Sequence, residues 1–219
     1  HWTDNHLPDR WQIRYKDYLT FNVKPMNFKH TGVFPEQAAN WDFIRDKVAS
    51  AGRPVRVLNL FAYSGGATLA AAAGGAEVYH VDASKGMVAW AKENAKSSGL
   101  ADKPIHWIVD DCGKFIQREI RRGRRYDGII MDPPSYGRGP SGEIWKMETS
   151  FYPFLLETAK LLTDNPLFVI INSYTTGLAP SAVGYASDVV FGGVHGGSTQ
   201  VGELGLPVVS SGLMLPCGS

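Results

Sequence analysis

Polar side chains stand close behind four of the five apolar segments in this chain, and a glycine pair follows the remaining one. Carboxylates and amides at such positions accept hydrogen bonds from the hydroxyl and amino groups of a ligand. Glycines in a turn let a ligand come close to the main chain. The polar residues at the segment ends are Asp82, Asp111, Asp132 and Asn172. This pattern predicts a binding site assembled from the ends of several strands.

The glycine pair lies within residues 55–82, which we expect to form a strand, a turn, a helix and a second strand. The continuous apolar run at residues 55–61 favours a strand covered on both faces. Asp82 follows Phe61 by 21 residues. A Rossmann-like unit places at about this distance the carboxylate that binds ribose hydroxyls. The segment is therefore predicted to bind a nucleoside.

The elements that position these residues alternate between strands and helices. Strands are expected at residues 55–61, 78–82, 105–109, 126–131 and 167–172, and helices at 41–51, 67–73, 83–98, 113–122 and 151–162. Such alternation predicts an α/β fold with a doubly wound, Rossmann-like sheet, in which the carboxyl ends of the strands gather the ligand site. The glycine-rich tail, 173–219, is weakly patterned, with a final hairpin expected at 201–215.

Residues 1–40 differ from the rest of the chain in their aromatic and β-branched content. Turn chemistry at Pro25 and Asn27 favours a β-hairpin or short meander there. We expect Asn40 to be the N-cap of the helix at 41–51. The predicted organisation is an N-terminal β-rich arm, 1–40, followed by one larger domain, 41–219.

Two motifs limit the chemistry. The first turn lacks the G-x-G-x-x-G pattern, which weakens a dinucleotide assignment and suits a ligand with adenosine but no phosphate. After the fourth strand, Asp132 is followed by Pro133 and Pro134, which cannot extend a sheet and force a rigid exit. This exit holds Asp132 at the site as an acceptor, and Tyr136 can stack on a planar substrate.

The stretches NLFAYSGG, VDAS, DDCGKF and MDPPSY occur in this order. In residues and spacing they resemble the class I S-adenosylmethionine-dependent methyltransferases. Within that class, the chain is most similar to the 23S ribosomal RNA methyltransferases that make 5-methylcytosine or 7-methylguanine. The resemblance extends from about residue 18 to residue 178. It implies a methyltransferase fold, S-adenosylmethionine as cofactor and an rRNA-like substrate.

The resemblance also implies individual roles. Asp82 would accept from both ribose hydroxyls, Asp111 would receive the adenine amino group, and the backbone N–H of Cys112 would lie beside the ring. Gln37 would reach the carboxylate end of the cofactor. Asp132, Pro133 and Pro134 would border the methyl group and its acceptor. The methionine part would be wrapped by residues Asn59, Phe61, Tyr63, Ser64, Gly65 and Gly66, with Ala83 and Ser84 beside the ribose acid.

The reaction product depends on cysteine. In the resembling group, 5-methylcytosine formation uses a cysteine just after the fifth strand as the nucleophile. That loop here reads Ser173-Tyr174-Thr175-Thr176-Gly177, and Thr175 is the nearest match. Direct in-line transfer to a nitrogen needs no such nucleophile, so methylation of a base nitrogen is expected. The alternatives are a non-RNA acceptor, cytosine C5 chemistry, a nicotinamide-dependent oxidoreductase and a non-catalytic nucleoside-binding protein.

Two basic regions are candidates for RNA contact. One is a cluster around residues 114–125 (Lys114, Arg118, Arg121, Arg122, Arg124, Arg125), which we call the arginine cluster. The other is the aromatic and basic arm, in which Trp11, Arg14, Tyr15, Lys16, Tyr18, Lys24 and Lys29 could stack on and hold a flipped base. The alternatives are that the cluster complements a helix dipole and that the arm packs as an ordinary hairpin.

Composition excludes several other classes. Net charge is +1 and 44% of residues are hydrophobic, as in a globular protein without a global preference for polyanions. No apolar run approaches the length of a membrane span, no secretory signal is predicted, and two distant cysteines favour a reducing compartment. A cytoplasmic location is expected. The six histidines show no paired ligand spacing, so no metal site is predicted.

Overall fold

A parallel sheet forms the centre of the molecule. The computed structural model describes residues 6–26, 30–138, 142 and 144–219. The sheet has five strands in the order β5-β4-β3-β6-β9, all parallel. The chain moves outward from β3 in one direction and then returns to start β6 on the other side of β3, so the carboxyl ends of β3 and β6 border a crevice. The strands are β3 (Arg56–Leu60), β4 (Glu77–Asp82), β5 (Ile105–Val109), β6 (Gly128–Met131) and β9 (Phe168–Ile171).

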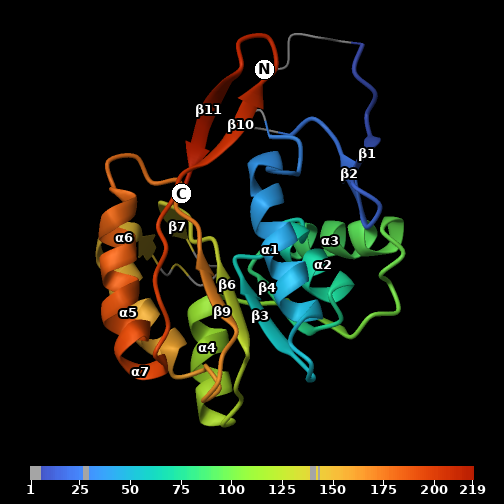
Figure 1. The fold of residues 1–219 in the computed structure, drawn as a ribbon. Coiled ribbons are helices and arrows are strands. Elements are labelled where there is room, and N and C mark those ends of the chain that lie inside the picture. The colour runs from blue at the N-terminus through green and yellow to red at the C-terminus, as the bar shows by residue number, and fades with distance from the viewer. Residues whose placement is uncertain (1–5, 27–29, 139–141, 143) are drawn as a thin grey trace.

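Helices cover both faces of this sheet (Figure 1). One layer holds α1 (Ala38–Ala49), α2 (Gly66–Ala73) and α3 (Lys85–Ser97). The other holds α4 (Cys112–Arg121), α5 (Met147–Ala159) and α6 (Pro180–Ser187), followed by the π-helix η3 (Asp188–Gly192) and the short α7 (Gly193–His195). Each layer buries its own apolar cluster against the sheet. The α/β doubly wound fold expected from the sequence is confirmed.

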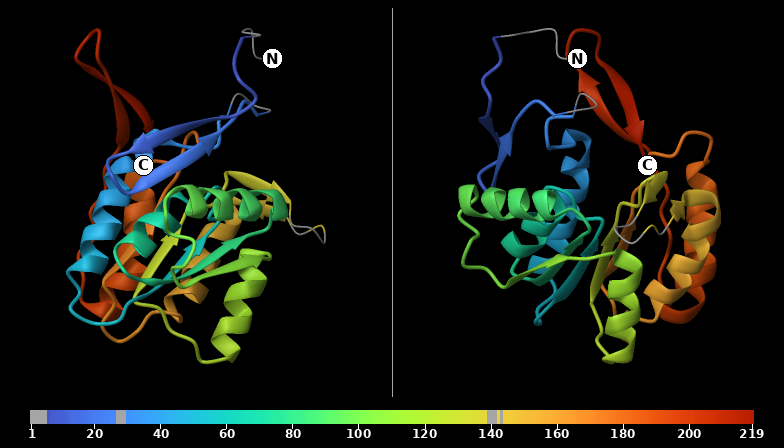
Figure 2. Two further views of the ribbon diagram at one scale, coloured as in Figure 1. Left: turned by 90° about the vertical axis from the view of Figure 1, so that its right-hand side faces the viewer. Right: turned by 180° about the vertical axis from the view of Figure 1, so that it is seen from behind.

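The N-terminal residues form an antiparallel hairpin of β1 (Trp11–Tyr15) and β2 (Leu19–Val23) that lies over α3 (Figure 2). The ring N–H of Trp90 donates to the Asn22 carbonyl at 2.7 Å, and the Asn22 N–H donates to Asn94 at 2.8 Å. The hairpin appendage is therefore confirmed. Asn27 lies outside the described residues, and the domain boundary after residue 40 stays a prediction.

The predicted N-cap at Asn40 is wrong. A single 3-10 turn, η2 (Pro35–Gln37), leads into α1, which begins at Ala38 with Gln37 in the cap position. Pro35 starts this turn because its fixed φ suits the first helical position. Asn40 consequently lies inside the helix, where its side chain bonds to Gln37 and to Asn172 at the exit of β9.

Two further hairpins frame the carboxyl edge of the sheet. The first, β7 (Tyr136–Arg138) with β8 (Ile144–Lys146), follows the double proline. The second, β10 (Leu204–Val208) with β11 (Leu213–Gly218), confirms the hairpin expected in the tail. Its end pairs with the main chain of Ser173 through Ser219. None of the helices in the described part of the chain is long and apolar enough to cross a bilayer.

Candidate functional site

The turn between β3 and α2 has an unusual backbone. Phe61 and Tyr63 have φ values of 56° and 50°, and Gly65 has 92°. Left-handed conformations are rare for non-glycine residues and are retained mainly where a site requires them. At Gly66, an added Cβ would lie 2.8 Å from the ring nitrogen of Trp41, so only glycine fits between the turn and α1. The turn therefore exposes main-chain groups at the start of α2.

Asp82, at the end of β4, supports this turn. Its two carboxyl oxygens accept from the backbone N–H groups of Tyr63 at 2.9 Å and Ser84 at 2.8 Å. Burial raises the pKa of Asp82, and these two hydrogen bonds oppose that shift. Ser84 in turn is the N-cap of α3, and Ala83 beside it is exposed. Asp82 is thus held at the edge of the turn, with lone pairs left for further donors.

Asn59 acts within the protein core. Its side-chain amide donates to the Thr68 hydroxyl at 2.9 Å, and that hydroxyl lies 2.9 Å from Nδ1 of His80. Burial lowers the pKa of His80 to about 3, so the ring is neutral. This relay locks β3, α2 and β4 together beneath the turn.

Two cavities adjoin at Phe61, which lines both. The smaller, about 60 Å³, lies over the turn and is bordered by Asp132 and Asn172 from the neighbouring strands. The larger, about 420 Å³, lies between α4 and α5. The predicted site residues on the smaller cavity are Gln37, Asn59, Phe61, Tyr63, Ser64, Gly65, Gly66 and Asp132, whereas Asp111 and Cys112 line the larger one.

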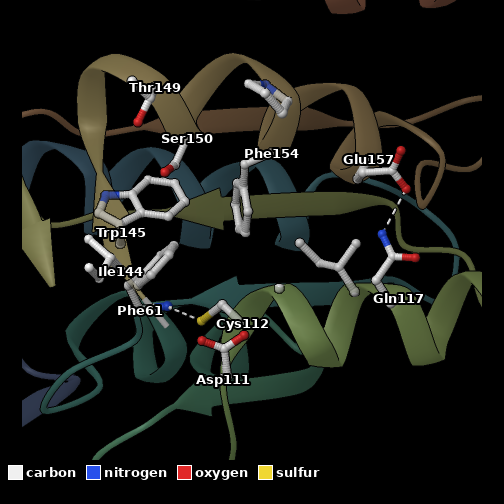
Figure 3. A pocket seen from close by; sticks show the side chains of 13 residues that line it. Phe61, Asp111, Cys112, Gln117, Ile144, Trp145, Thr149, Ser150, Phe154 and Glu157 are labelled. Atoms are coloured by element: carbon white, nitrogen blue, oxygen red, sulfur yellow. Dashed lines mark hydrogen bonds between the residues drawn. The ribbon is translucent and has the colours of Figure 1, made fainter. Parts of the chain in front are cut away.

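Aromatic rings form one end of the larger cavity (Figure 3). The ring centroids of Phe61, Trp145 and Phe154 lie 5.2–5.6 Å from one another. The Trp145 ring N–H donates to the carbonyl of Pro134 at 2.6 Å, which ties β8 to the double proline. Sequence reasoning missed Trp145 and Phe154 because they lie in a hairpin and a helix face without a motif.

The start of α4 forms the floor of the larger cavity. Asp111 is the N-cap and accepts from the Lys114 N–H at 2.9 Å. The sulfur of Cys112 accepts from the Phe61 N–H at 3.3 Å, and burial raises the pKa of this thiol. The side chain of Cys112 is therefore committed to holding the turn, while its backbone N–H belongs to the first, unpaired turn of the helix.

Asp132 presents an unpaired carboxyl group. Within the part of the chain that the structure describes, no hydrogen bond reaches its side chain, and the two prolines that follow it have no N–H to donate. Burial and the nearby charge of Glu36 raise the pKa of Asp132 to about 7. Pro133 is buried and Pro134 exposed, while Tyr136 points outward at the start of β7 with 52% of its surface exposed.

A hydrogen-bonded group joins η2 to the exit of β9. The Gln37 amide donates to the Tyr174 hydroxyl at 2.7 Å, and that hydroxyl donates to Glu36 at 3.2 Å. Asn40 links the Gln37 carbonyl oxygen to Asn172. Glu36 and Gln37 are both 8% exposed. Sequence reasoning included Gln37 but missed Glu36, although it is the neighbouring residue and also carries a carboxylate.

Comparison with known proteins identifies the family. A family model described as S-adenosylmethionine-dependent methyltransferase matches residues 1–163. The chain belongs to this family. A solved structure of a S-adenosylmethionine-dependent methyltransferase from Agrobacterium tumefaciens is 36% identical, with a TM-score of 0.91. The match covers 100% of this chain and 71% of that chain.

Two other relatives show partial matches. A Shewanella baltica protein named ribosomal RNA large subunit methyltransferase K/L is 36% identical over 132 residues, which are 60% of this chain. The match spans only 17% of that protein's length. A structure from Streptococcus mutans, a putative S-adenosylmethionine-dependent methyltransferase, shares the fold, with 24% identity and a TM-score of 0.71 over 88% of this chain and 48% of that chain.

The site fits S-adenosylmethionine, the cofactor of the family. The larger cavity is of a size that small ligands occupy, and its aromatic end suits a planar ring. Asp82 stands beside the turn with lone pairs that a diol would reach if the predicted role holds, and the smaller cavity lies over the glycines. Phe61 borders both cavities and so marks where the adenosine and methionine parts would join. The assignment of individual residues to parts of the cofactor stays a prediction.

Proposed function

We propose that the chain transfers a methyl group from S-adenosylmethionine to a nitrogen of an RNA base, in the cytoplasm, on an rRNA-like substrate. The choice of nitrogen rests on the residues around the smaller cavity. Asp132 presents its carboxyl group there, and no cysteine lines this cavity within the described residues. The family assignment sets aside the nicotinamide-dependent oxidoreductase.

The position of both cysteines argues against cytosine C5 chemistry. Cys112 is buried and bonded to the turn. Cys217 lies in β11, at the point where the pairing with β10 shifts register between Leu204 and Gly205. The Cys217 thiol donates to the Leu215 carbonyl at 3.3 Å. At the β9 exit, Thr175 instead pairs with Ser135 at 2.8 Å.

Asp132 and the two prolines that follow it suit transfer to nitrogen. When bound, S-adenosylmethionine supplies an electrophilic methyl group on a cationic sulfur. Asp132 is placed to accept a hydrogen bond from an amino or ring N–H and, in its ionised form, to take up a proton. Pro133 and Pro134 keep this carboxyl group from being satisfied by its own backbone. The protein thus contributes orientation and a proton acceptor.

RNA as the acceptor is supported by the relatives and by part of the surface. The Shewanella relative carries ribosomal RNA in its name. In the arginine cluster, however, Arg118 pairs with Asp110 and Arg122 with Glu119. Most of the cluster (Arg121, Arg122, Arg124 and Arg125) lies at the C-terminal end of α4, about 15 Å of helix from the first turn, which holds Lys114. This placement disfavours the cluster as the contact nearest to the target base.

In the N-terminal arm, the hydroxyls of Tyr15 and Tyr18 both donate to Asp42, and Lys16 forms an ion pair with the same residue. Lys24 lies over the Trp90 ring. These side chains hold the hairpin on α1 and α3, so they favour the alternative of hairpin packing. Arg14 remains exposed on this arm and is available to a phosphate.

The test is to incubate the protein with S-adenosylmethionine labelled in the methyl group and with unmodified large-subunit rRNA, and then to identify the labelled nucleoside by mass spectrometry. We expect a labelled N-methyl purine or an N-methyl exocyclic amine, formed far more slowly by Asp132→Asn. Labelled 5-methylcytosine would overturn the choice of nitrogen. Absence of label from every RNA, together with label in a small molecule or protein, would overturn the choice of RNA.

A further inference from the structure

The segment of the N-terminal arm that ends at Phe34 lies against the turn between β3 and α2. The Ser64 hydroxyl of that turn donates to the Gly32 carbonyl at 2.5 Å, and both residues are buried. Gly32 has a φ of 96°, and an added Cβ would lie 2.3 Å from the Trp90 ring, so this bend requires glycine. The chain is thus fixed on the turn two residues before Phe34.

The Phe34 ring contacts two tyrosine rings at the smaller cavity. Its centroid lies 5.5 Å from that of Tyr63 and 5.8 Å from that of Tyr174. Tyr63 belongs to the turn, whereas Tyr174 follows β9 and is held by a hydrogen bond from Gln37 at 2.7 Å. Phe34 and Tyr63 both line the cavity, and both are half-buried. Three distant segments therefore hold the Phe34 ring in place, and part of it is left for a ligand.

The smaller cavity combines aromatic rings with a carboxyl group. Its half-buried aromatic residues are Phe34, Phe61 and Tyr63. Among the described residues that line it, Asp132 is the one acid, and none is a lysine, arginine or histidine. The face of an aromatic ring attracts a cation, more strongly where water is excluded, and sites for methylated ammonium ions are built from such rings. The lining of this cavity therefore favours a methylated cation.

The cofactor of the family contains such a cation. The sulfonium of S-adenosylmethionine carries the methyl group and joins the adenosine part to the methionine part. Phe61 borders both cavities, so with adenosine in the larger one the sulfonium falls at the entrance to the smaller one. In S-adenosylhomocysteine the same sulfur is a neutral thioether, which lacks the charge that a ring face attracts.

We infer that Phe34 is a specificity-determining residue, whose ring, with that of Tyr63, makes the smaller cavity prefer the sulfonium of S-adenosylmethionine over the thioether of S-adenosylhomocysteine. Ser64 is a positioning residue, because its hydrogen bond to Gly32 holds the segment that carries Phe34. The attraction is lost when the methyl group leaves, so the same rings favour release of the product. The inference rests on the cofactor part of the proposed function and is independent of the methyl acceptor.

The experiment compares the binding of three ligands by isothermal titration calorimetry without RNA. They are S-adenosylmethionine, S-adenosylhomocysteine and sinefungin, which carries an amine where the sulfonium stands. Phe34→Leu removes the ring but keeps an apolar side chain at the cavity. We expect Kd for the two cationic ligands to rise about fivefold to tenfold, and Kd for S-adenosylhomocysteine to change by less than about twofold.

The matched control is Phe43→Leu, which removes an exposed ring on α1 and should leave all three affinities unchanged. Ser64→Ala keeps the Phe34 ring but releases Gly32, and should lower the preference for the cationic ligands by about twofold to threefold. It decides the question if Phe34→Leu fails to fold.

An equal change for all three ligands, or no change for any, would overturn the inference, since Phe34 would then contribute packing alone. The unaltered protein is titrated first. Its failure to bind S-adenosylmethionine would overturn the proposed function together with this inference, whereas binding without a preference set by Phe34 would overturn this inference only.

Discussion

The part of the site predicted to bind the methyl donor, which we call the donor half, differs from the part predicted to meet the methyl acceptor, the acceptor half. The difference lies in how many hydrogen bonds their polar groups already make within the protein. On the donor half, Asp82 accepts two backbone N–H bonds, Asp111 caps α4 and Cys112 accepts from Phe61. On the acceptor half, Asp132 accepts no hydrogen bond from the described residues and Glu36 accepts one. The donor half is thus complete before a ligand arrives, whereas the acceptor half leaves carboxyl oxygens for the ligand.

Because of this difference, we expect the donor half to control cofactor binding and the acceptor half to control the rate of methyl transfer. A preformed donor half loses little entropy on binding, because its turn and helix starts are already ordered. An acceptor half with unsatisfied carboxyl groups is costly to the folded protein, and such costs are typical of functional sites. Substitutions in the donor half should therefore weaken cofactor binding, and those in the acceptor half should slow transfer and stabilise the fold.

The largest effect is expected at Asp132. Asp132→Asn removes the proton acceptor but keeps the shape of the side chain, so the rate of methyl transfer should fall by roughly a thousandfold. S-adenosylmethionine affinity should fall less than tenfold. Single-turnover rates with labelled cofactor, alongside calorimetry, measure the two effects. A comparable fall in the transfer rate and in the affinity for S-adenosylmethionine would contradict the distinction between the two halves.

The second-largest effect is expected for Asp82→Ala. It removes the predicted acceptor for the ribose hydroxyls and leaves the Tyr63 N–H without its partner. Kd for S-adenosylmethionine should rise about a hundredfold, as expected when hydrogen bonds to a charged group are lost. The control is Asp110→Ala, another acid after a strand, whose side chain pairs with Arg118. It should change Kd less than threefold, and an equal loss in both variants would argue against Asp82 as the ribose acceptor.

The third effect concerns stability and pH. The folded-state pKa of Asp132, about 7, lies above the ordinary value, so its contribution to stability is fully present below about pH 4 and is lost as pH rises through 7. Asn has no proton to lose. Asp132→Asn should therefore raise the unfolding free energy by roughly 4 kcal/mol at pH 8 relative to pH 4. Urea unfolding at both pH values measures this, and a gap that does not depend on pH would contradict it.

The smallest effect is expected at Trp145, which connects the halves. Trp145→Phe keeps a ring against Phe61 and Phe154 but loses the hydrogen bond to the Pro134 carbonyl. The loss of one neutral hydrogen bond, about 1 kcal/mol, should raise KM for the acceptor about fivefold. Affinity for S-adenosylmethionine should stay within twofold. If cofactor affinity fell instead, Trp145 would belong to the donor half alone.

Much of the donor half was predictable because it is local in sequence. Strand, glycine turn, helix and strand follow one another within residues 55–82, and the Asp82 carboxylate bonds to the turn only 19 residues earlier. The acceptor half was less predictable. Tyr174 bonds to Glu36 across 138 residues, and no spacing along the chain indicates that contact. The error at Asn40 has the same origin, since its side chain serves Asn172 rather than a helix cap.

The sequence by itself determined the order of strands and helices, the strand-end acids and the rigid proline exit, because hydrophobic periodicity, glycine and proline act through neighbouring residues. The tertiary structure decided which of those acids are satisfied. Asp110 pairs with Arg118, Asp111 caps a helix, and Asp132 accepts no hydrogen bond from the residues that the structure describes. Charge and burial at a site depend on which distant segments pack together, and only the folded chain brings η2, β6 and β9 to one edge.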